Sequence, residues 1–178
     1  MVSAETLNYI LALGTVATQL VTLALLLLFF FGKNTTAFRW VVTKVETWGM
    51  WKLLLLSFGG SLLTLYYSEI LGYPPCPLCW WQRVFLYPQV ALFAVAIWKR
   101  EKLIVDYTIV LSGLGFLVAL YHHALQVLPS GSLPCPAEGT VSCAQRFVFE
   151  FGYITFPLMA ATLFAFFIAI LLFVRARN

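Results

Sequence analysis

The sequence Tyr-Pro-Pro-Cys-Pro-Leu-Cys-Trp-Trp-Gln-Arg, residues 73–83, lies between two long apolar runs. Its prolines end any helix arriving from the N-terminal side, and Pro77 suits the first position of a new helix whose N-cap is Cys76. Cys79 then lies in the first turn, where free backbone N–H groups and the helix dipole favour a thiolate. Arg83 follows one turn later on the same face. A C-x-x-C pair above a cation, at the start of a membrane helix, indicates redox chemistry at a membrane surface.

The composition is that of a membrane protein. Of the 178 residues, 62% are hydrophobic and 10% are charged, and the mean hydropathy is +0.91. These values exclude an ordinary soluble domain. The net charge of +4 would indicate nucleic-acid binding only if the charges clustered on a solvated face, whereas they lie in short gaps between apolar runs. We therefore expect membrane lipid around the protein and no nucleic-acid partner.

Five segments can cross about 30 Å of hydrocarbon, which takes roughly 20 residues each, and none alternates as β-barrel strands would. They are residues 7–31, 51–72, 79–98, 103–127 and 151–174. The first has no Lys or Arg before it and is too long for a signal-peptide core, so we expect a retained helix. The predicted fold is an all-α membrane protein, a four-helix transmembrane bundle with one additional N-terminal transmembrane helix.

Lysine and arginine are distributed unevenly among the gaps. They concentrate around the first gap, in the third gap and at the C-terminus, at Lys33, Arg39, Lys44, Lys52, Lys99, Arg100, Lys102, Arg175 and Arg177. The two gaps that hold the cysteines contain only Arg146. Because short cytoplasmic loops carry the excess of basic residues, we predict that the N-terminus and both cysteine loops lie outside and that the C-terminus is cytoplasmic.

Two further patterns concern the packing of the helices. Residues 38–51 carry three tryptophans among basic residues, which indicates either a segment along the inner membrane interface or an ordinary aromatic belt beside a span, and we favour the belt. Small residues within the second and fourth spans permit close helix contacts. They are Gly59, Gly60, Ser61, Ser112, Gly113 and Gly115.

The four cysteines form the close pair and a looser pair, Cys135 and Cys143. A two-residue spacer closes a very small ring, so a disulfide between Cys76 and Cys79 adds little stability and a redox role is favoured. The second pair lies in a polar, Gly- and Pro-containing loop on the same face, which favours exchange there too, with a structural disulfide as the alternative. A Cys₄ zinc site fits poorly, since the spacing is unsuitable and the oxidising side disfavours free thiolates, so we expect no metal.

Arg83, His122 and His123 are the polar candidates beside the close pair. Arg83 either reaches the lipid headgroups or stabilises the Cys79 thiolate and polarises an electron acceptor. At about 1.5 Å per residue, His122 lies roughly 28 Å along its span, at the depth of Arg83. Solvation at the interface is the alternative for both histidines, and Gln126 lies one turn beyond them in the same region.

Taken in order, these residues resemble the bacterial disulfide bond formation protein B family, in its short-loop subtype. The resemblance is carried by Ser68-Glu69-Ile70 with Gly72, Pro75-Cys76-Pro77-Leu78-Cys79-Trp80-Trp81-Gln82-Arg83 with Tyr87-Pro88, Tyr121-His122-His123 with Gln126, Cys143-Ala144-Gln145-Arg146, and Phe151-Gly152-Tyr153-Ile154-Thr155-Phe156-Pro157. These stretches cover residues 51–174, the four-helix core of the family. We accordingly divide the chain into an extra N-terminal helix with a cytoplasmic connector, 1–50, and an oxidoreductase core, 51–178.

The resemblance implies a thiol–quinone oxidoreductase of the bacterial cytoplasmic membrane that supports disulfide bond formation. It implies that a thioredoxin-fold thiol oxidase outside the membrane passes electrons to Cys135 and Cys143, and that these pass them to Cys76 and Cys79. The final acceptor is a membrane quinone, ubiquinone or menaquinone. The resemblance places it near Arg83, and we expect His122 or His123 to assist from the facing span.

Two alternatives stay open beside this reading. The vitamin K epoxide reductase-like proteins are related, but their loop cysteines precede the C-x-x-C, whereas here the C-x-x-C comes first. The second loop also departs from the pattern of longer-looped members of the family. Only seven residues separate Cys135 from Cys143, which leaves little room for the amphipathic segment that those members carry. The competing class is a membrane scaffold with two structural disulfides, and it would keep both oxidised when quinone is depleted.

Overall fold

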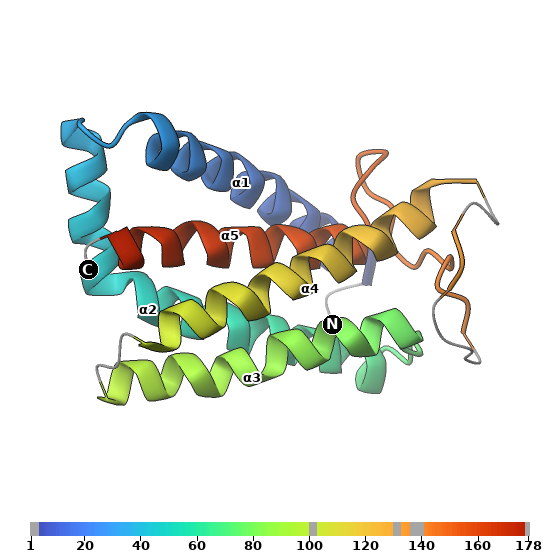
Figure 1. Cartoon of the computed structure of the whole chain (residues 1–178). Coiled ribbons are helices and arrows are strands. Elements are labelled where there is room, and N and C mark those ends of the chain that lie inside the picture. Colours follow the sequence, from blue (N-terminus) through green and yellow to red (C-terminus); the bar gives the residue numbers. More distant parts are fainter. Residues whose placement is uncertain (1–3, 100–102, 130–132, 136–140, 177–178) are drawn as a thin grey trace.

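The structure, a computed structural model, describes residues 4–99, 103–129, 133–135 and 141–176. Within these ranges the elements are helical, and the α-helices lie side by side in one bundle (Figure 1). They are α1 (Ala4–Phe31), α2 (Thr36–Leu65), the short π-helix η1 (Tyr66–Ile70), α3 (Pro77–Lys99), α4 (Leu103–Val127) and α5 (Phe156–Ala176). The predicted all-α membrane bundle is confirmed.

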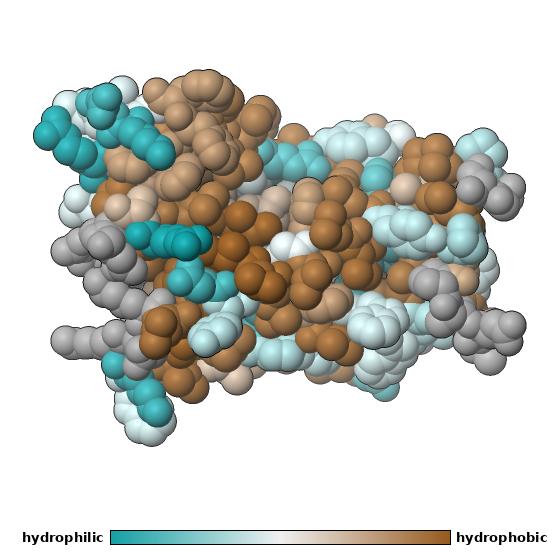
Figure 2. Space-filling view, in the orientation of Figure 1, coloured by the Kyte–Doolittle hydropathy of each residue, from teal (hydrophilic) through white to brown (hydrophobic). Residues whose placement is uncertain are grey.

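Four helices in the described part of the chain are long and apolar enough to cross a membrane. They span Ala4–Phe31, Trp48–Ile70, Ile104–Val127 and Phe156–Ala176. In Figure 2, hydrophobic side chains cover the middle of the bundle, and hydrophilic ones gather at the end where α1 meets α2. The protein is therefore a multi-pass membrane protein.

The fifth predicted span, 79–98, forms α3, a helix of 23 residues that is too polar to count among those four. It nevertheless packs within the bundle, against α2 and α4. Its polar side chains Arg83 and Gln89 are buried, at 6% and 0% exposure. Because polar groups in a membrane helix face other helices rather than lipid, the low apolarity of α3 reflects what it contributes to the interior.

Helix α5 lies at the centre of the bundle and packs against α4, α1 and α2. Half of the residues in its most apolar 18-residue stretch are buried, against 17% for α1, so α5 supplies much of the core. Helices α4 and α5 come very close at Gly115 of α4, where an added Cβ atom would lie 2.6–2.8 Å from the ring of Phe164 on α5. A side chain at this position would force the Phe164 ring to move, which confirms the predicted close contact at Gly115. An added Cβ at Gly59 or Gly113 would meet nothing within 4 Å.

Helix α2 begins at Thr36, well before the predicted start of the span at 51. Thr35 is its N-cap, and its hydroxyl accepts a hydrogen bond from the Phe38 backbone N–H at 3.2 Å. The first part of α2 runs across the end of the bundle before the chain bends into it (Figure 1). Trp40 and Trp48 are exposed on this part. The arrangement favours the interfacial segment over the aromatic belt that we had preferred.

Helix α5 begins at Phe156, so the predicted start of the fifth span at 151 was wrong. The backbone of Glu150 and Ile154 pairs through two hydrogen bonds of 2.9 and 2.8 Å, which closes a tight reversal. Phe151 and Gly152 turn the chain there with φ of 50° and 75°. Helix cannot form through such a turn, and it starts only after Thr155, whose hydroxyl accepts from a backbone N–H of the first turn.

The bundle has two chemically different ends. Figure 1 shows the start of α1 and both cysteine-bearing segments at one end, and the α1–α2 connection and the end of α5 at the other. This division agrees with the charge pattern, although the side of the membrane that each end faces stays a prediction. The division into 1–50 and 51–178 also stays a prediction, and α1 packs along α5 of the proposed core.

Candidate active site at the cysteine-bearing end

The close cysteine pair lies at the start of α3, as predicted. The π-helix η1 ends α2, and Gly72 with a φ of 70° turns the chain into the proline segment. Helix α3 then begins at Pro77. The backbone N–H of Cys79 donates to the sulfur of Cys76 at 3.3 Å, so Cys76 is the N-cap, and its side chain lies at the positive end of the helix dipole.

Both cysteines of this pair are free thiols in the structure, and their sulfurs are 2.8 Å apart. Cys76 is buried at 3% exposure and Cys79 is half-buried. The hydrogen bond from the Cys79 side chain lowers the pKa of Cys76 to about 4; burial opposes this shift and His122 adds to it. The reduced pair therefore holds its thiolate on Cys76. The sequence alone had indicated a thiolate on Cys79. Which of the two thiols donates to the other depends on how their side chains are arranged, and the sequence does not show that arrangement.

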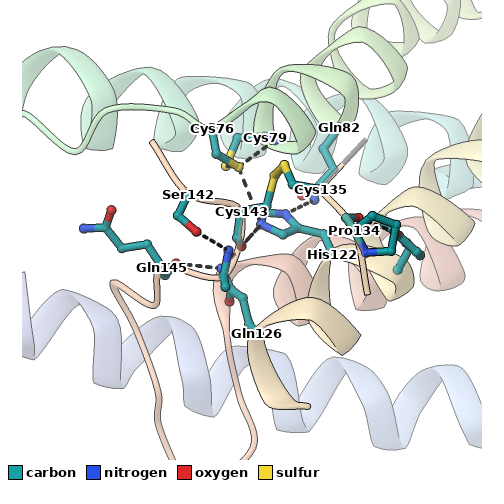
Figure 3. The surroundings of a disulfide bond; sticks show 12 residues. Cys76, Cys79, Gln82, His122, Gln126, Pro134, Cys135, Ser142, Cys143 and Gln145 are labelled. Carbon is teal, nitrogen blue, oxygen red and sulfur yellow. Dashed lines mark hydrogen bonds between the residues drawn. A yellow bond between two sulfur atoms is a disulfide. The ribbon is translucent and has the colours of Figure 1, made fainter. Parts of the chain in front are cut away.

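Cys135 and Cys143 are joined by a disulfide, with Cα atoms 5.9 Å apart. Cys135 is exposed, whereas Cys143 is 1% exposed and belongs to the same buried cluster as Cys76 and Leu125. Figure 3 shows this disulfide facing the sulfurs of Cys76 and Cys79. One cysteine of the second pair is thus exposed, and the other is buried beside Cys76 of the C-x-x-C.

His122 lies between the two cysteine pairs and is almost completely buried. Its Nε2 atom is 3.5 Å from the sulfur of Cys76 and 3.1 Å from the carbonyl oxygen of Cys143. Its Nδ1 atom is 2.8 Å from the amide nitrogen of Gln82 on α3. With that amide donating to Nδ1, the Nε2–H is left to donate to the Cys143 carbonyl and towards Cys76. One imidazole therefore contacts α3 and the second cysteine loop (Figure 3).

Two other side chains of α4 hold the second loop on either side of its disulfide. The Tyr121 hydroxyl donates to the Pro134 carbonyl at 2.5 Å, next to Cys135 in the chain. The Gln126 amide donates to the Gln145 carbonyl at 2.9 Å, just beyond Cys143. These bonds explain how a short loop, anchored through its backbone, keeps one cysteine in contact with the C-x-x-C.

An apolar cavity of about 230 Å³ opens on the other side of the pair, and Cys79 lines it. Arg83 also lines it and is the only charged residue among the described residues of its wall. The guanidinium donates to the Thr64 carbonyl at 2.8 Å and lies over the ring of Trp80 at 5.0 Å. The other polar lining residues include Thr64, Tyr67, Ser68 and Gln82, and most of the remainder are apolar.

The two histidines lie apart from this cavity. His122 contacts Cys76 rather than the cavity, and the Nδ1 atom of His123 is 2.9 Å from the hydroxyl of Thr155 at the start of α5. Consecutive residues of a helix point about 100° apart, so the two side chains of α4 face different neighbours. The structure brings Arg83 together with Cys79, and His122 together with Cys76. It brings His123 to neither cysteine among the contacts it describes.

Gln82 and Tyr67 are site residues that sequence reasoning missed. Gln82 was quoted only as part of the stretch 73–83, although a buried His needs a partner for its second nitrogen. Tyr67 lies in η1, and a π-helical turn often marks a functional site, but no sequence pattern announces one.

Three possible metal ligands meet at this site: the sulfurs of Cys76 and Cys79 and a ring nitrogen of His122 lie within 4.8 Å of one another. The alternative that we weighed from sequence used all four cysteines. In the structure Cys135 and Cys143 bind each other instead. The expectation of no metal stays a prediction.

The chain matches the family described as disulfide bond formation protein DsbB over residues 46–174. It belongs to this family. It is 42% identical over 113 residues to the SPbeta prophage-derived disulfide bond formation protein B of Bacillus subtilis, which covers 64% of this chain and 76% of that protein. It is 38% identical over 130 residues to the probable disulfide formation protein C of Halalkalibacterium halodurans, covering 72% and 93%. No solved structure gives a significant match.

Membership of the DsbB family gives the site its general role. The chain is an oxidoreductase that takes part in disulfide bond formation, and the predicted family and this activity are confirmed. Both cysteine pairs, Arg83 and His122 lie within the matched residues, whereas α1 lies outside them.

Proposed function

We propose that the protein oxidises a dithiol partner outside the cytoplasmic membrane of a bacterium and passes the electrons to a membrane quinone. The observation that carries the proposal is the position of the C-x-x-C between two environments. Cys76 contacts His122 and shares a buried cluster with Cys143, while Cys79 lines an apolar cavity with Arg83. Each sulfur therefore has its own exchange partner.

The first step takes place at the exposed end of the second pair. A thiolate of the partner attacks the sulfur of Cys135 and forms a mixed disulfide, which releases Cys143 as a thiolate. The second thiolate of the partner then attacks the partner's first sulfur in that mixed disulfide. This forms the disulfide of the partner and releases Cys135 as a thiolate. A thioredoxin-fold thiol oxidase is the partner that the family resemblance suggests. The exposure of Cys135 and the burial of Cys143 support this order.

The second step transfers the disulfide between the two pairs. The Cys143 thiolate attacks Cys76 of the oxidised C-x-x-C and releases Cys79, and Cys135 then attacks Cys143, which closes the loop disulfide and releases Cys76. The low pKa of Cys76 makes it a good leaving thiolate. His122 touches both sides of this exchange and can hold a proton at Nε2 for the departing sulfur.

The cavity beside Cys79 suits a quinone. Its wall is mainly apolar, as a ring with an isoprenoid tail requires, and Arg83 presents guanidinium donors that can bind a quinone oxygen. When bound there, a quinone supplies the acceptor for the two electrons and two protons that the dithiol loses. Cys79 presents its sulfur to the cavity, Arg83 supplies a fixed cation, and the apolar walls exclude water.

The experiment uses the purified protein with a reduced thioredoxin-fold oxidase and decylubiquinone, followed by the absorbance of the quinone. Replacing Cys135 and Cys143 by Ala should stop oxidation of the partner, because the entry point is removed. The same variant should still pass electrons from a small dithiol to quinone through Cys76 and Cys79. A Cys76→Ala/Cys79→Ala variant should lose both reactions.

The scaffold alternative predicts different results. A scaffold would show no quinone reduction, and all its disulfides would stay oxidised when cells are depleted of quinone. If partner oxidation continues at the normal rate without Cys135 and Cys143, the second loop is only a structural staple and the proposed electron path is wrong.

A further inference from the structure

The cavity beside Cys79 has a wall that the family core does not supply. Leu11 and Thr15 of α1 line it together with residues of α2, α3 and α5. Helix α1 lies outside residues 46–174, the part of the chain that matches the family. It packs along α5 and touches α2 only lightly. The cavity therefore lies among α1, α2, α3 and α5.

Helix α1 is held in place by polar contacts on one face. Its buried polar residues Asn8, Thr15 and Thr22 recur every seven residues, which places them on one side of the helix. Gln19, on the same side, donates to the Thr162 hydroxyl at 3.1 Å and accepts from the Tyr153 hydroxyl at 3.1 Å. The hydroxyls of Thr15 and Thr22 donate to carbonyls of α1 itself, so the contacts that fix how α1 docks are those of Gln19 and Asn8, which lipid could not provide.

One of these contacts fixes a residue of the cavity wall. The Tyr67 hydroxyl donates to the side-chain oxygen of Asn8 at 2.5 Å, and both residues are buried. Tyr67 lines the cavity, and its ring packs edge-on against Phe156 at 4.6 Å. Asn8 does not line the cavity, but it accepts the hydrogen bond of the Tyr67 hydroxyl. Thus α1 acts on the cavity both directly, through Leu11, and indirectly, through Asn8.

We propose that α1 is part of the acceptor site: Leu11 and Thr15 contact the bound quinone, and Asn8 is a positioning residue that acts through Tyr67. This inference rests on the proposed function and adds that the extra helix determines how tightly a quinone is held. The quinone ring lies beside Cys79 and Arg83, and its tail passes between α1 and α2 into the lipid. Apolar contact with α1 holds the part of the molecule next to the ring.

The test compares Leu11→Phe with Leu13→Phe. Leu11 lines the cavity, whereas Leu13 is 48% exposed on the same helix, outside the lining residues. Extra volume at position 11 fills part of the cavity, so we expect the dissociation constant of decylubiquinone to rise by about tenfold or more, as overpacking usually costs that much. Quenching of tryptophan fluorescence measures binding directly. Leu13→Phe should bind as the unmodified protein does.

A second comparison addresses the positioning role of Asn8. Asn8→Ala and Tyr67→Phe should each raise the KM for quinone, and the double variant should raise it no further than the stronger single one, because both remove the same bond. The KM for the thiol partner and the rate of partner exchange should stay unchanged. Additive effects, or a loss of partner exchange, would show that α1 only supports the fold.

The outcomes separate this inference from the proposed function. If the unmodified protein neither binds nor reduces decylubiquinone, the proposed function fails. If it does both, and the dissociation constant of decylubiquinone is the same in Leu11→Phe and Leu13→Phe, only the role of α1 is overturned. Should Leu11→Phe fail to fold, Leu11→Ala replaces it: removing the apolar contact must also weaken binding, and unchanged binding in that variant refutes the inference.

Discussion

Cys76 of the reduced protein should be a thiolate throughout the physiological pH range. Its pKa falls from the ordinary 9.0 to about 4, mainly because the Cys79 side chain donates a hydrogen bond to it. A folded-state pKa below the unfolded value stabilises the reduced, folded protein. That contribution is complete above about pH 9 and is lost as the pH falls towards 4.

Two substitutions of Cys79 isolate the hydrogen bond. Cys79→Ser keeps a donor on the side chain, and Cys79→Ala removes it. A hydrogen bond to a charged group contributes about 1.5–3 kcal/mol, and one pKa unit corresponds to about 1.4 kcal/mol. The pKa of Cys76 should therefore be about 1–2 units higher in Cys79→Ala than in Cys79→Ser.

The measurement needs a protein with one thiol. Both substitutions are made with Cys135 and Cys143 replaced by Ala, so that Cys76 is the only cysteine left. The rate of alkylation by iodoacetamide, which reacts with the thiolate, is then followed from about pH 3 to about pH 10. The midpoint of the rate profile gives the pKa in each variant. Adding His122→Ala to the Cys79→Ser protein should raise the midpoint as well, because His122 is a second cause of the shift.

Equal midpoints in the Ser and Ala variants would refute the reasoning, since the donor at position 79 would then have no influence on Cys76. A midpoint near the ordinary value in the Cys79→Ser protein would refute it too. That result would leave no support for a thiolate on Cys76 in the reduced pair.

Three other predictions follow from the fold and the cavity. Arg83→Ala should slow quinone reduction by about ten- to a hundredfold, the loss of one hydrogen bond to a charged group, while exchange between the partner and the second pair survives; both half-reactions are measured separately. On intact cells, a cysteine introduced at Lys33 should resist an impermeant thiol reagent and one at Leu133 should react, and the reverse pattern would place the redox pairs in the cytosol. Gly115→Ala should lower the free energy of unfolding by about 1–3 kcal/mol, seen as a lower thermal unfolding temperature, because the new Cβ meets the Phe164 ring. The control is Gly113→Ala, where the new Cβ has open space, and equal effects of the two substitutions would contradict the close α4–α5 contact.

The fold class and the start of α3 could be predicted because both depend on short-range properties. Apolar length determines which segments can cross a membrane, and the prolines with Cys76 determine where a helix ends and the next begins. The two cysteine pairs could be assigned for the same reason, since ring size and loop composition are visible in the sequence. None of these features depends on how distant side chains are rotated.

The details that sequence reasoning missed depend on long-range contacts. The depth of His122 follows from the rise per residue, but its rotation about α4, which brings it to Cys76 and leaves it out of the cavity wall, does not. The start of α5 is delayed by a turn closed through backbone hydrogen bonds. The cavity wall on α1 comes from Leu11 and Thr15, which are 68 and 64 positions away in the chain from Cys79 and are brought near by packing on α5.

The spacing of the C-x-x-C meets two geometric requirements at once. Three residues are slightly less than one helical turn, so Cys76 at the N-cap and Cys79 in the first turn bring their sulfurs to 2.8 Å. The remaining rotation between them is enough for Cys76 to contact His122 while Cys79 lines the cavity with Arg83. One residue more or fewer would turn the second sulfur by about 100° and move it from the first sulfur or from the cavity. A two-residue spacer therefore lets a single pair form a disulfide and still present one sulfur to the second loop and the other to the acceptor.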